Sequence, residues 1–186
     1  RDMMTSVFKS QIPAMEKSDF LVMFEPVGAT AQPIVITQNE FMRRMKDMAA
    51  IQSGMAFYGE LPDSYNLIVN TDHPLSQKVI ADTESACKSE LTPILDELKT
   101  VNEEIERLQE AKKDKKDDEI PVADKEALKH AEEKAKELRA KESDILKTYA
   151  DRTPLVRQLV DLALLSNNML KGEALSKFIK RSVEML

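Results

Sequence analysis

The chain has 186 residues, enough for one domain with a hydrophobic core and an appendage. Its 27 basic and 33 acidic residues give a net charge of -6, which argues against duplex nucleic acid as the main partner. A single cysteine, Cys87, excludes an internal disulfide and fits a reducing compartment. We find no apolar run of transmembrane length and no signal peptide, and therefore expect a cytoplasmic protein with no membrane partner.

Residues 1–84 have the pattern of a small α/β unit. Residues 2–12 predict an amphipathic helix that Pro13 ends. Apolar runs at residues 20–24, 34–37 and 65–69 predict three strands. Helices between these strands favour the α+β class, with a small, mostly antiparallel three-stranded sheet that has helices on one face.

A methionine-rich helix is predicted between the second and third strands. Thr37 and Glu40 have the spacing of a capping box, and the helix that they start runs over residues 41–55. Two interpretations of its apolar side chains stay open. The side chains either pack in an ordinary core or form a flexible, polarisable surface for varied apolar partners. The side chains concerned are Phe41, Met42, Met45, Met48 and Met55.

Residues 85–150 predict a charged antiparallel helical hairpin, inserted after a helix that opens at His73-Pro74. Thr92-Pro93 predicts the start of the first arm, and the charged run 112–119 with Pro121 predicts the tip. The first arm has a heptad seam of Leu91, Ile94, Leu98, Val101, Ile105 and Leu108. The second has Leu128, Ala131, Ala135, Leu138, Glu142, Ile145 and Tyr149, with Glu142 as the misfit.

Residues 151–186 predict two helices that Gly172 separates. Thr153-Pro154 predicts the start of the first helix. Two adjacent helices with so much apolar surface form half of a four-helix core. The other half lies elsewhere in the chain or in a second copy of it. The candidate interface residues are Leu155, Leu159, Leu162, Leu165, Met169, Leu175, Phe178, Ile179, Val183 and Leu186.

Four stretches together resemble one family. They are SVFKSQIP, VITQNEFMRRMKDM, FYGELPDSYNLIVNTDHPL and LVRQLVDLALLSNNMLKGEALSKFIKRSVEML. They look like the C-terminal domain of the heat-shock protein 90 chaperones of the bacterial HtpG type. The resemblance covers residues 1 to about 84 and about 148 to 186. The charged hairpin is longer than the corresponding connection in well-known members, and nothing is carried over to it.

The resemblance implies a homodimer joined by a four-helix bundle made from the last two helices of each protomer. It also implies that the protruding helix of residues 41–55 contacts unfolded or partly folded client proteins. In the family, ATP and Mg belong to a separate N-terminal domain that no residue of this chain matches. We therefore expect no cofactor, no catalytic residue and no enzyme activity in this fragment.

A function of another class stays open beside the chaperone dimer. In this alternative the chain is a coiled-coil adaptor or scaffold whose hairpin binds a partner protein. An enzyme has no constellation of residues in its favour, because no Gly-rich phosphate loop or nucleophile motif is present. A metal site is not expected either, because His73 and His130 lie far apart in the sequence and Cys87 has no partner.

Overall fold

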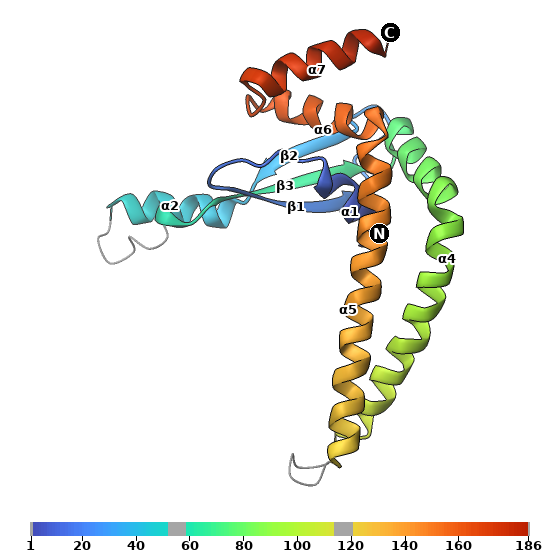
Figure 1. The fold of residues 1–186 in the computed structure, drawn as a ribbon. Helices are drawn as coiled ribbons and strands as arrows, with labels where there is room; N and C mark the ends of the chain where they lie inside the picture. Colours follow the sequence, from blue (N-terminus) through green and yellow to red (C-terminus); the bar gives the residue numbers. More distant parts are fainter. Residues whose placement is uncertain (1, 52–58, 114–120, 186) are drawn as a thin grey trace.

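The computed structural model describes residues 2–51, 59–113 and 121–185, and Figure 1 shows their arrangement. Met55 and Leu186, both candidate site residues, lie outside the described residues. The α+β class is confirmed. In chain order the elements are α1 (Asp2–Ser10), β1 (Ser18–Glu25), β2 (Ile34–Gln38), α2 (Glu40–Ile51), β3 (Asp63–Asn70), α4 (Pro74–Glu110), α5 (Val122–Asp151), α6 (Pro154–Ser166) and α7 (Gly172–Glu184).

The three strands form a mixed sheet in the order β1-β3-β2. The β1–β3 pair is parallel, with Ser18 opposite Asp63, and the β2–β3 pair is antiparallel, with Ile34 opposite Val69. The expectation of a mostly antiparallel sheet is therefore wrong in this detail. Strands that follow each other in sequence usually pair, but here β3 inserts between β1 and β2.

One face of the sheet carries the core. Phe20, Val22 and Leu67 are among the strand residues that alternate onto this face and are buried. Met4, Val7 and Phe8 of the predicted first helix pack into the same cluster, together with residues of α5 and α6. The core consequently holds α6 in place, and α6 carries α7 (Figure 1).

The helix α4 is a single helix of 37 residues, so the predicted start at Thr92 is wrong. It begins as expected at His73, whose Nδ1 accepts a hydrogen bond from the Leu75 N–H at 3.1 Å. The Thr92 hydroxyl donates to the Lys88 carbonyl at 2.7 Å instead of capping a new helix. Pro93 lacks the N–H of a regular turn, and Figure 1 shows that α4 is bowed, as a proline inside a helix causes.

The hairpin contributes to two separate hydrophobic clusters. Its base belongs to the main core through Cys87, Leu91, Leu146 and Ala150. Its outer part, which we call the distal arm (residues 96–141), has its own seam. That seam consists of Leu98, Val101, Ala135 and Leu138, with Ile105 and Ala131 half-buried beside it, and it also contacts Ile94 just before the arm. Near the base, α5 buries Leu146 and Ala150 more deeply than the predicted Ile145 and Tyr149, because α5 turns this side toward α1.

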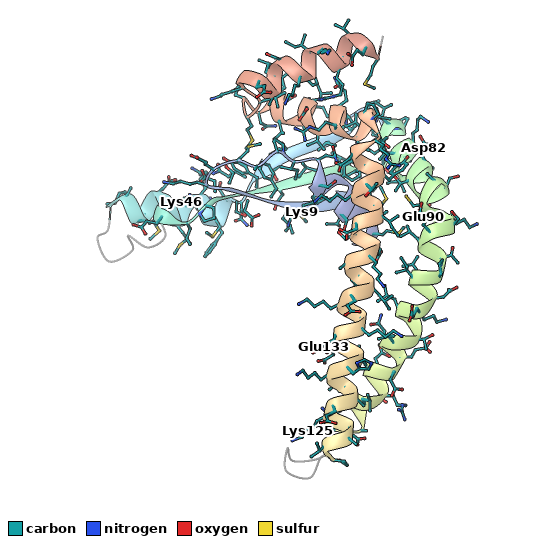
Figure 2. All side chains as sticks on the ribbon, in the orientation of Figure 1. Lys9, Lys46, Asp82, Glu90, Lys125 and Glu133 are labelled. Atoms are coloured by element: carbon teal, nitrogen blue, oxygen red, sulfur yellow. The ribbon has the colours of Figure 1, made fainter. Side chains whose placement is uncertain are left out.

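Charged side chains cover the outside of the hairpin. Lys125 and Glu133 lie on the distal half of α5, and Glu90 lies near the base of α4 (Figure 2). Lys134 pairs with Glu97 across the two helices at 2.6 Å, between partly exposed side chains. Solvent screens exposed pairs of this kind and they contribute little to stability, so the apolar seam is the main stabilising feature of the distal arm.

The two clusters predict different results for two deletions. Replacing residues 96–141 by a glycine-serine linker removes the distal seam and keeps Leu91 and Leu146. We expect the remaining body to unfold cooperatively within a few degrees of the intact chain in calorimetry. A deletion from residue 89 to 148 also removes Leu91 and Leu146. Each lost Leu in a core costs about 2–5 kcal/mol, so this control should lose its folding transition. Equal melting temperatures for the two deletions would contradict the assignment of the base to the core.

Candidate interaction surfaces

The connection between α6 and α7 differs from the prediction. The helix α6 ends at Ser166, and Asn168 takes the left-handed conformation with φ 56°. The N–H groups of Asn168 and Met169 donate to the carbonyls of Leu165 and Leu164 at 3.0 and 2.8 Å, the bonds of a Schellman motif. Gly172 is therefore not the stop of the first helix. It has φ 57° and is the first residue of α7.

Thr153 and Pro154 occupy the first positions of α6, as predicted. The Thr153 hydroxyl does not cap the helix, however. It donates to the Tyr149 carbonyl at 2.9 Å, at the end of α5. The side chain thus links the two helices where the chain turns.

The helix α6 is apolar on two sides, and the structure separates their roles. The inner side packs in the chain's own core and consists of Val156, Leu159, Val160, Ala163 and Leu164. Leu159, a candidate interface residue, is thus buried within the protomer. On the outer side Leu162 is exposed, and Leu155 and Leu165 are half-buried. The outer side is the part of α6 that a partner can reach.

The helix α7 lies at the outside of the molecule and packs on α6 (Figure 1). None of its residues is buried. Leu175 and Phe178 are half-buried against the core, whereas Ile179 is 54% exposed and Val183 68%. We call the exposed apolar residues of this region, Leu162, Ile179, Val183 and Met185, the C-terminal apolar surface.

A buried carboxylate holds α7 on α6. The side chain of Asp161 is 1% exposed and accepts from Arg157 at 3.1 Å and from Arg181 of α7 at 2.5 Å. Arg181 also donates to Gln158, and Gln158 donates to the Ser182 hydroxyl. The second oxygen of Asp161, Oδ1, is buried without a hydrogen-bond partner. A buried ion pair adds little net stability but fixes geometry, and breaking it is strongly destabilising.

The helix α2 begins differently from the predicted capping box. Its N-cap residue is Asn39, whose Oδ1 accepts from the Met42 N–H at 3.2 Å. Thr37 lies in β2, paired with Asn66. The carboxylate of Glu40 binds Arg43 and Arg44 at 2.9 and 2.8 Å. The asparagine therefore performs the capping that the sequence pattern assigned to the threonine.

Exposed apolar side chains follow one side of α2, which extends away from the end of the sheet (Figure 1). Phe41 is 67% exposed and Ile51 85%, and Met48 is exposed as well. Met42 and Met45 are only half-buried, and Ala49 is buried. We call Phe41, Met48 and Ile51 the α2 apolar surface. Ile51 was not among the residues predicted for this surface, although its spacing of three from Met48 places it on the same side of the helix.

One ion pair links α2 to the sheet. Lys46, which lies on α2 in Figure 2, approaches the Asp63 carboxylate at the start of β3 to 2.7 Å. The Lys46 side chain is the less exposed of the two. The pair adds a side-chain contact to the backbone hydrogen bond that the Asn39 N–H donates to the Ser64 carbonyl of β3 at 2.9 Å.

The stretch IVNTDHPL, at residues 68–75, has a structural role that the sequence analysis did not identify. Asn70 is fully buried, and its side chain makes four hydrogen bonds. It accepts from the Val27 and Asp72 N–H groups and donates to the Gly28 and Gln32 carbonyls. This asparagine therefore fixes the β1–β2 connection beside the start of α4.

Within the described ranges, no three His, Cys, Asp or Glu side chains gather as potential metal ligands. Among the same residues, none of the helices combines the length and apolarity needed to cross a bilayer.

Curated relatives match the chain over its whole length. The chaperone proteins HtpG of Bacteroides thetaiotaomicron and of Bacteroides fragilis strain 638R are each 47% identical over 186 residues. That of Porphyromonas gingivalis ATCC 33277 is 45% identical. The chain spans 27% of the length of each of these relatives. Neither a family model nor a solved structure matches the chain significantly.

These matches place the chain in the heat-shock protein 90 family. The chain belongs to the HtpG family and corresponds to its C-terminal domain.

The arginines beside Glu40 predict an acidic titration. Hydrogen bonds from Arg43 and Arg44 lower the pKa of Glu40 from 4.5 to about 2. The stabilising pairs are therefore complete above pH 4.5 and are lost as the pH falls through about 2. We expect an NMR titration of the Glu40 carboxyl carbon to have its midpoint near pH 2. Replacing both arginines by glutamine should return it toward 4.5, and a midpoint near 4.5 in the unmodified chain would contradict the pairing.

Proposed function

We propose that this chain joins two protomers of a chaperone through α6 and α7 of each, packed as a four-helix bundle. The observation that carries the proposal is the C-terminal apolar surface, most of which belongs to α7 and the residue after it, because α7 buries none of its residues in its own protomer. Each large apolar side chain kept in water forgoes up to about 1.5–3 kcal/mol of burial free energy. A second copy with the same surface would cover these side chains.

A two-fold interface suits this surface because it is self-complementary. Leu162 on α6 and Ile179 and Val183 on α7 would meet the same residues of the partner. The half-buried Leu155, Leu165, Met169, Leu175 and Phe178 would lie around them. Leu159 would support the interface from inside the protomer, since it is already buried there.

We further propose that the α2 apolar surface contacts unfolded or partly folded client proteins. Support comes from the exposure of Phe41, Met48 and Ile51 on a helix that extends from the body. Contiguous exposed apolar side chains indicate a binding surface, because stability alone does not favour them. Methionine suits varied partners since its side chain is flexible and polarisable.

The proposed role involves no covalent chemistry by this chain. Joining the protomers at one end raises the effective concentration of their distant parts for each other. ATP hydrolysis would belong to parts of the full-length chaperone outside this chain. The free, buried Cys87 fits a reducing compartment such as the cytoplasm.

The coiled-coil adaptor receives less support. The apolar residues of the distal arm mostly pack in its own seam, and several charges on its surface are paired within the arm. No described feature of the arm favours a partner protein over water.

The dimer is tested by charged substitutions at exposed positions. Replacing Ile179 and Val183 by aspartate places four charges in the two-fold interface. We expect monomers by light scattering at low micromolar concentration, where the unmodified chain is a dimer. Folding should change little, because exposed positions usually alter stability by about 0.5 kcal/mol. The matched control is V122D at an exposed apolar residue on α5, which should stay dimeric. A dimeric double variant would place the interface elsewhere.

The client surface is tested by polar substitutions on α2. F41S together with M48S should weaken capture of carboxymethylated, permanently unfolded lactalbumin by about tenfold, since two apolar contacts are lost. Melting temperature and dimer mass should stay within error of the unmodified chain, and V122S serves as control. A fall in melting temperature with unchanged capture would show that these side chains stabilise the fold and do not bind clients.

A further inference from the structure

The strand β1 combines an apolar sequence with an edge position. Residues 20–24 are apolar on both faces of the strand. Phe20 and Val22 are buried in the core, whereas Leu21 on the opposite face is 59% exposed. Strands that are apolar on both faces are typical of sheets covered on both sides. Among the described residues, β1 pairs only with β3, so its outer edge has no neighbouring strand.

The second face of the sheet continues this apolar surface. Met23 lies opposite Ile68 in β3, and Ile68 lies opposite Val35 in β2. All three side chains are half-buried, and Leu21 extends the row along β1. We call Leu21, Met23, Val35 and Ile68 the open sheet face.

The direction of the β1 backbone groups follows from the hydrogen bonds at its two ends. The Lys17 carbonyl accepts from the Asp63 N–H and the Glu25 carbonyl accepts from the Thr71 N–H, so odd-numbered residues face β3. Backbone groups alternate along a strand, and those of Phe20, Val22 and Phe24 consequently point outward. The Asp19 carboxylate accepts from the Phe20 N–H at 2.9 Å, which agrees with this assignment. The outward groups of Val22 and Phe24 follow along the same edge.

Acidic side chains flank this edge. Glu16 and Asp19 lie at one end of β1 and Glu25 at the other, with Lys17 as the one cation of residues 16–25. The charges favour an incoming segment with basic residues at its ends. They disfavour a second copy, because antiparallel pairing of two β1 strands about Val22 places Asp19 opposite Glu25. Like charges directly opposite destabilise a strand pair.

We propose that the outer edge of β1 binds an extended segment of an unfolded polypeptide as an added strand. The segment has basic residues at its ends. It is apolar at the alternate positions whose side chains lie on the same side of the sheet as the open sheet face. Backbone pairing gives affinity that is largely independent of sequence, as a chaperone with many clients requires. The inference rests on the proposed client binding and adds a second contact to the α2 apolar surface.

The first test uses synthetic peptides and the intact 186-residue chain. The probe is a fluorescein-labelled peptide of alternating valine and threonine with lysines at both ends, measured by fluorescence anisotropy. A matched peptide carries N-methyl groups on alternate residues, which removes the donors that face β1. We expect the methylated peptide to bind more than about tenfold more weakly, because several hydrogen bonds are lost. A version with glutamates at its ends should also bind more weakly, and the difference should shrink at high salt. Equal affinity of the methylated peptide would overturn the proposal.

The second test changes one backbone donor of β1. V22P removes the outward N–H of Val22 and leaves the hydrogen bonds between β1 and β3 in place. V22A is the control, because it keeps this N–H and loses a similar amount of side-chain packing. We expect V22P to bind the lysine peptide about fivefold more weakly than V22A. Deuterium exchange of the unmodified chain gives an answer even if V22P fails to fold. The peptide should protect the amides of Val22 and Phe24 and leave those of Leu21 and Met23 unchanged. Unchanged exchange at Val22 and Phe24 would overturn the proposal.

A third comparison separates this inference from the proposed function. The F41S and M48S double variant should bind the lysine peptide within about twofold of the unmodified chain. A much weaker affinity of the double variant for the peptide would show that the peptide binds at α2 and not at β1, and would overturn the inference. Loss of lactalbumin capture in that variant, together with no peptide binding to the unmodified chain, would overturn the β1 site alone. Peptide binding with capture insensitive to α2 would instead overturn the α2 client surface.

Discussion

The buried carboxylate of Asp161 is the interaction on which the C-terminal surface depends. It receives Arg157 from its own helix and Arg181 from α7, whereas α7 has no buried residue. Because the core gives α7 few contacts, this ion cluster and the half-buried Leu175 and Phe178 set its orientation. In that orientation Ile179 and Val183 face outward. The charge cluster thus holds in place an apolar surface that the protomer alone cannot bury.

Three peripheral elements, α2, α7 and the distal arm, each join the main core through a small number of contacts. The main core joins the sheet, α1, α6 and the hairpin base. The helix α2 is linked through the Lys46–Asp63 pair, α7 through Asp161, and the distal arm through the base of α4 and α5. Elements with few buried contacts open most easily, and binding surfaces are often built on them. The proposed dimer contact on α7 and the proposed client contact on α2 would therefore lie on parts of the chain that contribute little to its core, whereas the proposed client contact at β1 lies on a core strand.

The sequence predicted the elements where a local pattern decides them. Three apolar runs became three strands, and the heptad seam from Leu91 to Leu108 became the inner side of α4. It failed where distant contacts decide. The insertion of β3 between β1 and β2 depends on residues far apart in the sequence. The helix α4 continues past Pro93 because buried residues before and after the proline hold both parts of the helix in place. Asparagines at 39 and 168 replaced the expected Thr37 cap and Gly172 stop, because several residue types can perform each task. In a helix as apolar as α6, the pattern could not separate the inward Leu159 from the outward Leu162.

Amide hydrogen exchange in α7, followed over a dilution series of the unmodified chain, tests whether a second copy covers the C-terminal apolar surface. If a second copy covers the C-terminal apolar surface, the amides of Gly172–Glu184 should be protected at high concentration. They should lose protection on dilution, in step with a fall in mass toward the 21.1 kDa of one chain. Protection in the main core, for example at Leu67 and Val69, should stay unchanged. Protection of α7 that does not vary with concentration, in a chain that stays at 21.1 kDa, would contradict the account.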